Sequence, residues 1–334
     1  MQRFTIYLFS FIIITIFNTC KTDFDVTAPY KETMVVYGLL NASSDTNWVR
    51  INKAFLGDGN AYDMAKAHDP DSTNYPDILD VNMEVRNSSG SLLGTLNLIR
   101  DSSIAKESGI FDNTKNILYR TNGVDKLNQA YNYTLAVTNR ETGTSVSAKT
   151  EVVDSVTIFK PFDGQLINFG STGNPYGSFY TEWGAVAEGA FYQLTIRLNY
   201  SEVSVSNPTD TVQKYVDWVF VQQTENTGNK FSQSVVYPQF YSFIASQLQP
   251  DNNVNRIASD SVELIFTVGA RDFFTYINVN HPPTGANQNI PQYSNINGGL
   301  GIFSSRSKEI KSFGLNVESR IELNSGPITG GLFQ

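Results

Sequence analysis

The sequence predicts an all-β fold built from two antiparallel β-sandwich domains, with one short amphipathic helix in the second. Many short segments alternate apolar and polar side chains, and turn residues separate them at sandwich-like spacing. Only one segment, residues 238–249, has clear helical spacing. A composition of 40% hydrophobic and 13% aromatic residues is typical of a folded chain. The length of 334 residues is more than one ordinary hydrophobic core accommodates, so two domains are expected.

Residues 1–19 have the features of a secretion signal. Arg3 precedes an apolar run over residues 4–17 that is too short to span a bilayer stably. Cys20, the single cysteine of the chain, follows after two small polar residues. This arrangement resembles the signal of bacterial lipoproteins, in which the cysteine becomes the lipidated first residue. We therefore expect a lipid on Cys20; the alternative is an ordinary signal peptide with an incidental cysteine.

Residues 20–32 are expected to form a lipidated tether. Lys21, Asp23 and Asp25 directly follow the cysteine, and Pro29 interrupts regular structure. An acidic run at this place resembles the export signal that sends lipoproteins of Bacteroidota to the outer face of the outer membrane. The alternative is a solvated linker. The sequence thus predicts an outer-membrane lipoprotein that faces the cell surface.

Residues 33–152 are predicted to form the first sandwich. Val81, Met83 and Val85 share one face of a segment whose other face is polar, as a half-buried strand requires. Further strands are expected at residues 34–40, 48–55, 92–98, 131–137 and 145–150.

An insertion at residues 57–80 interrupts the first sandwich. Its polar part contains Asp69, Asp71 and Asn74, followed by Asp77 and Asp80, which are hard oxygen ligands of the kind that calcium selects. Their spacing departs from the EF-hand pattern, so a solvated acidic loop is the preferred interpretation and a calcium site is the alternative. The insertion as a whole is either a loop that contacts a ligand or partner or a cover over the edge of the sandwich. No metal or other cofactor is expected.

Residues 153–334 are predicted to form the second sandwich. Strands are expected at residues 156–159, 179–183, 191–200, 215–221 and 262–268, whereas residues 273–279 fit either helix or strand. In the predicted helix at 238–249, Phe240, Phe243, Ile244 and Leu248 recur at spacings of three and four. The Gly-rich tail from Asn324 is expected to be flexible.

Asn297, Gly298 and Gly299 belong to a second Gly-rich segment, which allows positive φ angles and close backbone approach. A tight turn that leads into a final strand is the preferred interpretation, and a ligand or partner loop is the alternative. The segment lacks the lysine, the hydroxyl and the following helix of a phosphate-binding loop.

Four segments resemble one known family: residues 32–40, 49–56, 59–73 and 291–303. Together with the leader they resemble the Bacteroidota outer-membrane lipoproteins of the domain of unknown function 4249 family. The resemblance covers nearly the whole chain and implies an N-terminal sandwich. The strand spacing itself predicts an immunoglobulin- or fibronectin-like architecture for the two sandwiches. The resemblance also implies proximity to TonB-dependent transporters, whose genes often neighbour those of the family. No catalytic residues are established for that family, so none are implied here.

The chain offers few candidates for catalysis. Its two histidines, His68 and His281, are far apart in sequence, and no nucleophile-elbow motif occurs. The net charge of −8 opposes binding to nucleic acid. The leading hypothesis is a non-enzymatic accessory or capture subunit of an outer-membrane transporter, with a β-barrel protein as partner. A free-standing glycan- or peptide-binding module or adhesin is the alternative, and a hydrolase is the least supported class.

Overall fold

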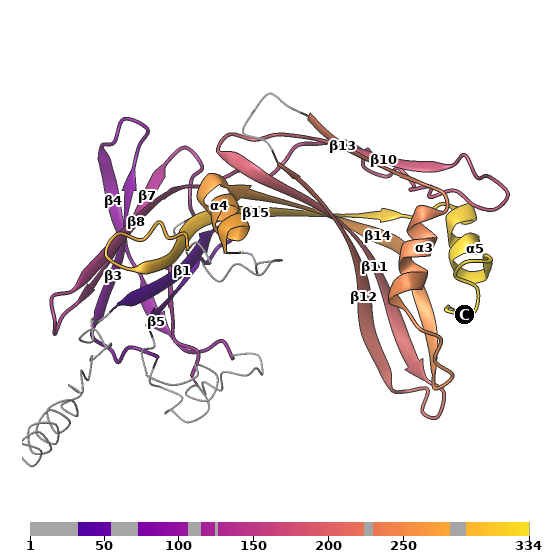
Figure 1. Ribbon diagram of the computed structural model, residues 1–334, viewed down its shortest axis with the longest axis horizontal. Coiled ribbons are helices and arrows are strands. Elements are labelled where there is room, and N and C mark those ends of the chain that lie inside the picture. Colours follow the sequence, from indigo (N-terminus) through magenta and orange to yellow (C-terminus); the bar gives the residue numbers. More distant parts are fainter. Residues whose placement is uncertain are drawn as a thin grey trace, which may run out of the picture.

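The computed structural model describes residues 33–54, 73–105, 115–123, 126–223, 230–280 and 292–333. Two lobes lie side by side in an elongated molecule, and long strands run between them (Figure 1). The predicted fold class is confirmed, since sandwich-like antiparallel sheets make up most of the described chain and the helices are short.

The first unit is a sandwich of two sheets. One sheet contains β1 (Met34–Leu40), β2 (Trp48–Lys53), β6 (Leu118–Arg120) and β5 (Ile99–Asp101). The facing sheet has the order β4 (Leu92–Asn97), β3 (Leu79–Arg86), β7 (Asn132–Asn139) and β8 (Ser145–Glu151). The alternation seen in the sequence is the burial pattern of β3, where Val81 and Met83 enter the core.

The strand β15 (Leu300–Gly314) belongs to both units. Its residues 300–305 pair in parallel with β1, and its residues 306–314 pair antiparallel with β14. One eight-stranded sheet results, in the order β12-β11-β14-β15-β1-β2-β6-β5. The predicted boundary at residue 153 therefore needs one correction, because Ile296 and Phe303 lie in the core of the first unit.

The second unit packs two sheets and two helices around its own core, and a third helix lies on the other face of the long sheet. Its part of the long sheet contains β11 (Gly189–Ser204), β12 (Thr211–Gln223) and β14 (Val254–Ala270). A three-stranded sheet of β13 (Lys230–Val236), β10 (Ser178–Gly184) and β9 (Ile158–Lys160) covers it. Trp183 lies between the sheets, with its ring centroid 5.3 Å from that of Phe266 and 5.8 Å from that of Phe231.

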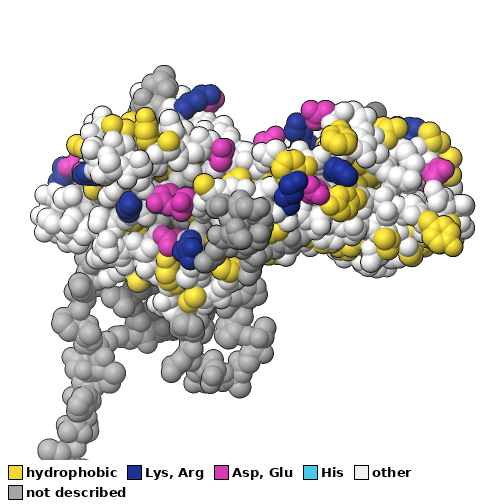
Figure 2. Space-filling view, turned by 90° about the horizontal axis from the view of Figure 1, so that it is seen from above, with side chains coloured by type: hydrophobic (Ala, Val, Ile, Leu, Met, Phe, Trp, Pro, Cys, Tyr) yellow, Lys and Arg dark blue, Asp and Glu magenta, His cyan; other side chains and the backbone are white. Residues whose placement is uncertain are grey.

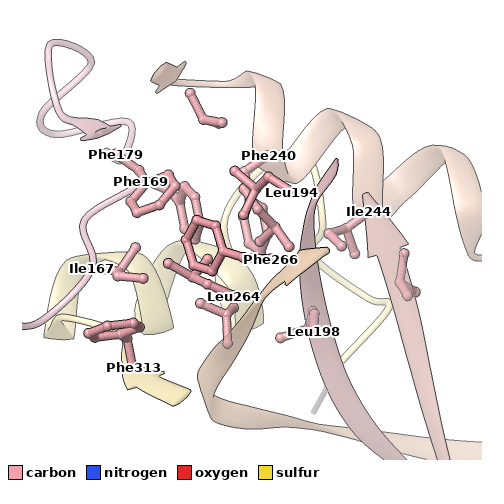
Figure 3. Close-up of a cluster of buried hydrophobic side chains, with 14 of the residues drawn as sticks. Ile167, Phe169, Phe179, Leu194, Leu198, Phe240, Ile244, Leu264, Phe266 and Phe313 are labelled. Atoms are coloured by element: carbon pink, nitrogen blue, oxygen red, sulfur yellow. The ribbon is translucent and has the colours of Figure 1, made fainter. Parts of the chain in front are cut away.

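Helices α3 and α5 close this core, and α3 confirms the helix predicted from its apolar spacing. Helix α3 (Gln239–Gln247) buries Phe240 and Ile244, and Phe240 stacks on Phe169 with centroids 3.9 Å apart (Figure 3). Residues 273–279, which fit either structure by pattern, belong to helix α4 (Arg271–Val279), and α5 (Val317–Ser325) follows β15. No helix in the described part of the chain is long and apolar enough to cross a membrane.

The segment after α5 corrects the expectation of a flexible tail. Leu332 and Phe333 are buried in the second core, and the Phe333 ring lies edge-on to Tyr200 at 6.0 Å. Thr329 Oγ1 donates a hydrogen bond to the Glu322 carbonyl oxygen at 3.0 Å, which turns the segment back toward α5. The glycines suggested mobility, but the apolar side chains at the end of the segment decide its placement.

Candidate binding groove on the open face of the long sheet

Most residues proposed from the sequence as parts of a site lie outside the described residues. These are Cys20, Lys21, Asp23, Asp25, Asp69 and Asp71. Asn74 is described and is buried; its Oδ1 accepts a hydrogen bond from Asn52 Nδ2 at 3.0 Å, and its Nδ2 donates to the Lys115 carbonyl oxygen at 3.2 Å. The Asn74 side chain is thus occupied within the fold.

The acidic residues after Asn74 have partners of their own. Arg140 lies 2.7 Å from Asp80 and 3.9 Å from Asp77. Among the described residues no group of three or more His, Cys, Asp or Glu could hold a metal ion.

Asn297, Gly298 and Gly299 form a tight turn that leads into β15, which is the preferred interpretation of this segment. Asn297 exchanges two backbone hydrogen bonds with Ser147 on β8, and Gly298 has a φ of 79°. A Cβ at Gly299 would stand 2.7 Å from the Met34 carbonyl oxygen. The turn is packed between β1 and β8, so glycine is required there by close backbone approach.

The structure reveals a groove on the open face of the long sheet, which no sequence pattern predicted. In β11, Tyr192, Leu194 and Ile196 enter the second core, so the residues between them face the opposite side of the sheet. On that open side a groove of about 270 Å³ runs over β11 and β14 and is bounded by α4, β12 and β15. The floor contains Thr195 and Ile265, both only 4% exposed.

Helix α4 forms an aromatic wall of this groove. The Phe273 ring lies edge-on to Phe191, with centroids 5.9 Å apart and an interplanar angle of 89°. It also covers Gly269, where a Cβ would stand 2.3 Å from Phe273 Cδ1. The backbone N–H of Phe273 donates to Ser304 Oγ at 3.2 Å, which ties the start of the helix to β15. Glycine at 269 is what allows the helix to approach the sheet this closely.

The same helix contacts the first unit. The Tyr276 ring lies edge-on to Tyr37 on β1, with centroids 6.5 Å apart. Burial, together with a hydrogen bond to Tyr37, raises the pKa of Tyr276 to about 12. Helix α4 therefore joins the two units beside the groove.

The charged groups of the groove differ in whether they are paired. Arg197 forms a two-point ion pair with Asp217 across neighbouring strands, at 2.7 and 2.8 Å, and its guanidinium lies 3.9 Å from the Tyr215 ring centroid. The hydrogen bonds to Asp217 raise the pKa of Arg197, so this pair stays ionised. Arg306 and Lys308 are exposed two residues apart on β15, and neither has an ion pair or hydrogen bond within the described chain.

Exposed apolar side chains continue beyond the groove on the open face. Val219 and Val221 on the edge strand β12 are 47% and 51% exposed, and Ile310 on β15 is 49% exposed. In the view of Figure 2, hydrophobic side chains gather at several places over the second unit, whereas acidic and basic side chains are interspersed. Apolar surface next to a groove is typical of a contact site for another molecule.

A second hollow of about 220 Å³ lies at the junction of the units, lined in part by Glu151 of β8 and Glu188 before β11. A hydrogen bond with Glu188 and burial raise the pKa of Glu151 above that of an exposed glutamate.

Comparisons with known proteins do not identify a family or a function for this chain. No protein-family model matches the chain, and a search of curated proteins finds no relative. One solved structure, trypsin-activated α-2-macroglobulin from Escherichia coli, is similar at 10% identity with a TM-score of 0.17. The match covers 72% of this chain and 14% of that protein. Because the TM-score is so low, this match supports no conclusion about the fold or the function of the chain.

Proposed function

We propose that this chain is a cell-surface lipoprotein, anchored in the outer membrane through Cys20, that acts as a non-enzymatic accessory or capture subunit. Its partner would be a β-barrel transporter of the TonB-dependent kind or a similar outer-membrane machine. The observation that carries the capture role is the open face of the long sheet, where exposed Val219, Val221 and Ile310 adjoin a groove. The apolar run before Cys20 supports the anchor.

The arrangement of the two units supports this role. The described chain begins at Thr33 in the first unit, whereas the open face with the groove belongs to the second unit (Figure 1). Continuous pairing along β15 joins the two units through backbone hydrogen bonds. A partner held on the second unit would therefore be held at a defined distance from the first unit, to which the tether is attached.

The test is purification of the tagged protein from native outer membranes in mild detergent, followed by mass spectrometry. We expect a β-barrel protein in comparable amounts, and we expect Cys20→Ala to move the protein out of the membrane fraction. The double variant Val219→Asp and Val221→Asp should lose the barrel. Val317→Asp, which changes an equally exposed valine on α5, serves as the matched control and should keep it.

Two results would contradict parts of this proposal. A Cys20→Ala protein that stays in the membrane fraction would contradict the lipid anchor. Recovery of the lipoprotein alone under all mild conditions would contradict the partner. That second result favours a free-standing glycan- or peptide-binding module or adhesin, for which the same groove would be the binding site.

A further inference from the structure

We propose that the groove binds an acidic, amphipathic segment of a protein partner, with carboxylates on Arg306 and Lys308 and apolar side chains against the Phe191–Phe273 wall. This inference rests on the proposed function, because it names the chemistry of the partner at the same site. The occupant is an extended polypeptide in which acidic and apolar residues alternate.

Two basic residues of the groove, Arg306 and Lys308, have no acidic partner within the described chain. Every other arginine in the described chain has an ion pair, a hydrogen bond or another such interaction, whereas Arg306 has no ion pair or hydrogen bond within the described residues. Lys308 lies on the same face of β15, two residues or about 6–7 Å further along. Two unpaired cations side by side are unusual in a chain of net charge −8. They are free to bind a carboxylate without losing an existing pair.

The surroundings of the two cations contain no competing acid at the neighbouring strand positions. Across the sheet Arg306 lies opposite Gly269, and Lys308 lies opposite Thr267. The one acidic residue that lines the groove, Asp217, is held by Arg197. A negatively charged group in the groove would therefore be attracted by Arg306 and Lys308 on β15. No unpaired acidic residue among the lining residues would repel it.

The apolar surface favours a peptide over a glycan. Sugars stack on flat, accessible ring faces, but Phe273 lies over Gly269 and meets Phe191 edge-on. The wall can still receive an aliphatic or aromatic side chain, and Gln193 and Thr267 offer hydrogen-bonding groups to a main chain. Alternating side chains of an extended segment would thus meet the wall and the cations in turn.

The experiment measures binding of a fluorescein-labelled peptide of repeated Asp-Phe-Asp-Val to the purified, detergent-solubilised protein. We expect saturable binding that weakens as salt rises from about 50 to about 500 mM, because ion pairs at an exposed site are screened. The double variant Arg306→Glu and Lys308→Glu should weaken binding about tenfold or more. The matched control, Lys126→Glu with Lys311→Glu, has the same charge change away from the groove and should bind within about twofold of the unaltered protein.

Several outcomes would overturn the inference. These are equal binding by the groove variant, equal binding of a peptide with Lys in place of Asp, and displacement of the acidic peptide by oligogalacturonate, which would indicate an anionic glycan site. Failure of the inference is distinguishable from failure of the proposed function. If the barrel co-purifies with the Arg306→Glu and Lys308→Glu protein, the accessory role stands and only the acidic-segment chemistry is wrong.

Discussion

Gly301 on β15 lies directly against Val36 on β1, where the last strand enters the first sandwich. A Cβ at position 301 would stand 2.0 Å from the Val36 carbonyl oxygen, and Gly301 has a φ of 109°. The two residues are register partners in the parallel β1–β15 pair. Any side chain at 301 would therefore force the two strands apart.

We expect Gly301→Ala to lower the free energy of unfolding by about 3 kcal/mol or more, because strain and a backbone clash add. Chemical denaturation of the detergent-solubilised protein measures this change. Gly90→Ala is the matched control, since Gly90 has a φ of 85° but nothing within 4 Å of a Cβ. It should cost about 1–2 kcal/mol from strain alone. Equal losses in the two variants would show that the contact with Val36 is unimportant.

Phe303 and Phe313 test whether β15 makes the two units unfold together. Phe303 is buried in the first core and Phe313 in the second, although both lie on the same strand. Replacement of either by Ala should cost about 3–5 kcal/mol. Because one strand completes both units, we expect each variant to weaken hydrogen-exchange protection in both cores. Loss of protection confined to one unit would mean that the units unfold independently.

The segment after α5 should contribute to stability. Phe333 is 2% exposed and packs against Tyr200, so Phe333→Ala should lower the free energy of unfolding by about 3 kcal/mol. Phe162→Ala removes a ring that is 66% exposed and should change stability by less than about 0.5 kcal/mol. Thermal unfolding of the two variants gives the comparison, and indistinguishable melting temperatures would contradict the packed position of Phe333.

Asp101 should contribute a pH-dependent stability. Hydrogen bonds from the Ser103 hydroxyl and backbone N–H, together with Arg120 at 2.6 Å, lower the pKa of Asp101 from 3.8 to about 2. The folded state therefore favours the ionised carboxylate, and its stabilising effect is present above about pH 4 and is lost as the pH falls to about 2. We expect the stability difference between the unaltered protein and Asp101→Asn to shrink over this interval. Denaturation curves at stepped pH values measure it, and a difference independent of pH would contradict the assignment.

Local pattern predicted much of the secondary structure. Period-two alternation places strands such as β3 and β11 because one face of each lies in a core. The spacing of Phe240 and Ile244 likewise places α3. The first part of β15 lacks such alternation, since its residues 301–305 are all buried. Its pairing with β1 depends on contacts between distant parts of the chain, which a single sequence does not specify.

The groove could not be predicted for a related reason. Arg197 and Lys308 each occupy ordinary polar positions in alternating strands, where solvent exposure is the usual explanation. Only the strand order brings them together under α4. The unpaired state of Arg306 is likewise a property of its neighbours Gly269 and Thr267, which are remote in sequence.

The shared strand also sets an order of events during synthesis, in which the N-terminal part of a chain is made first. Among the described residues all other strands of both units precede β15, so β1 has no partner on one side until residues 300–305 have been made. During that interval the first sandwich has an open strand edge and an unfilled place for Phe303. Until then the β1 edge is a site at which other chains could pair, and residues 300–305 remove that site when they complete the sheet.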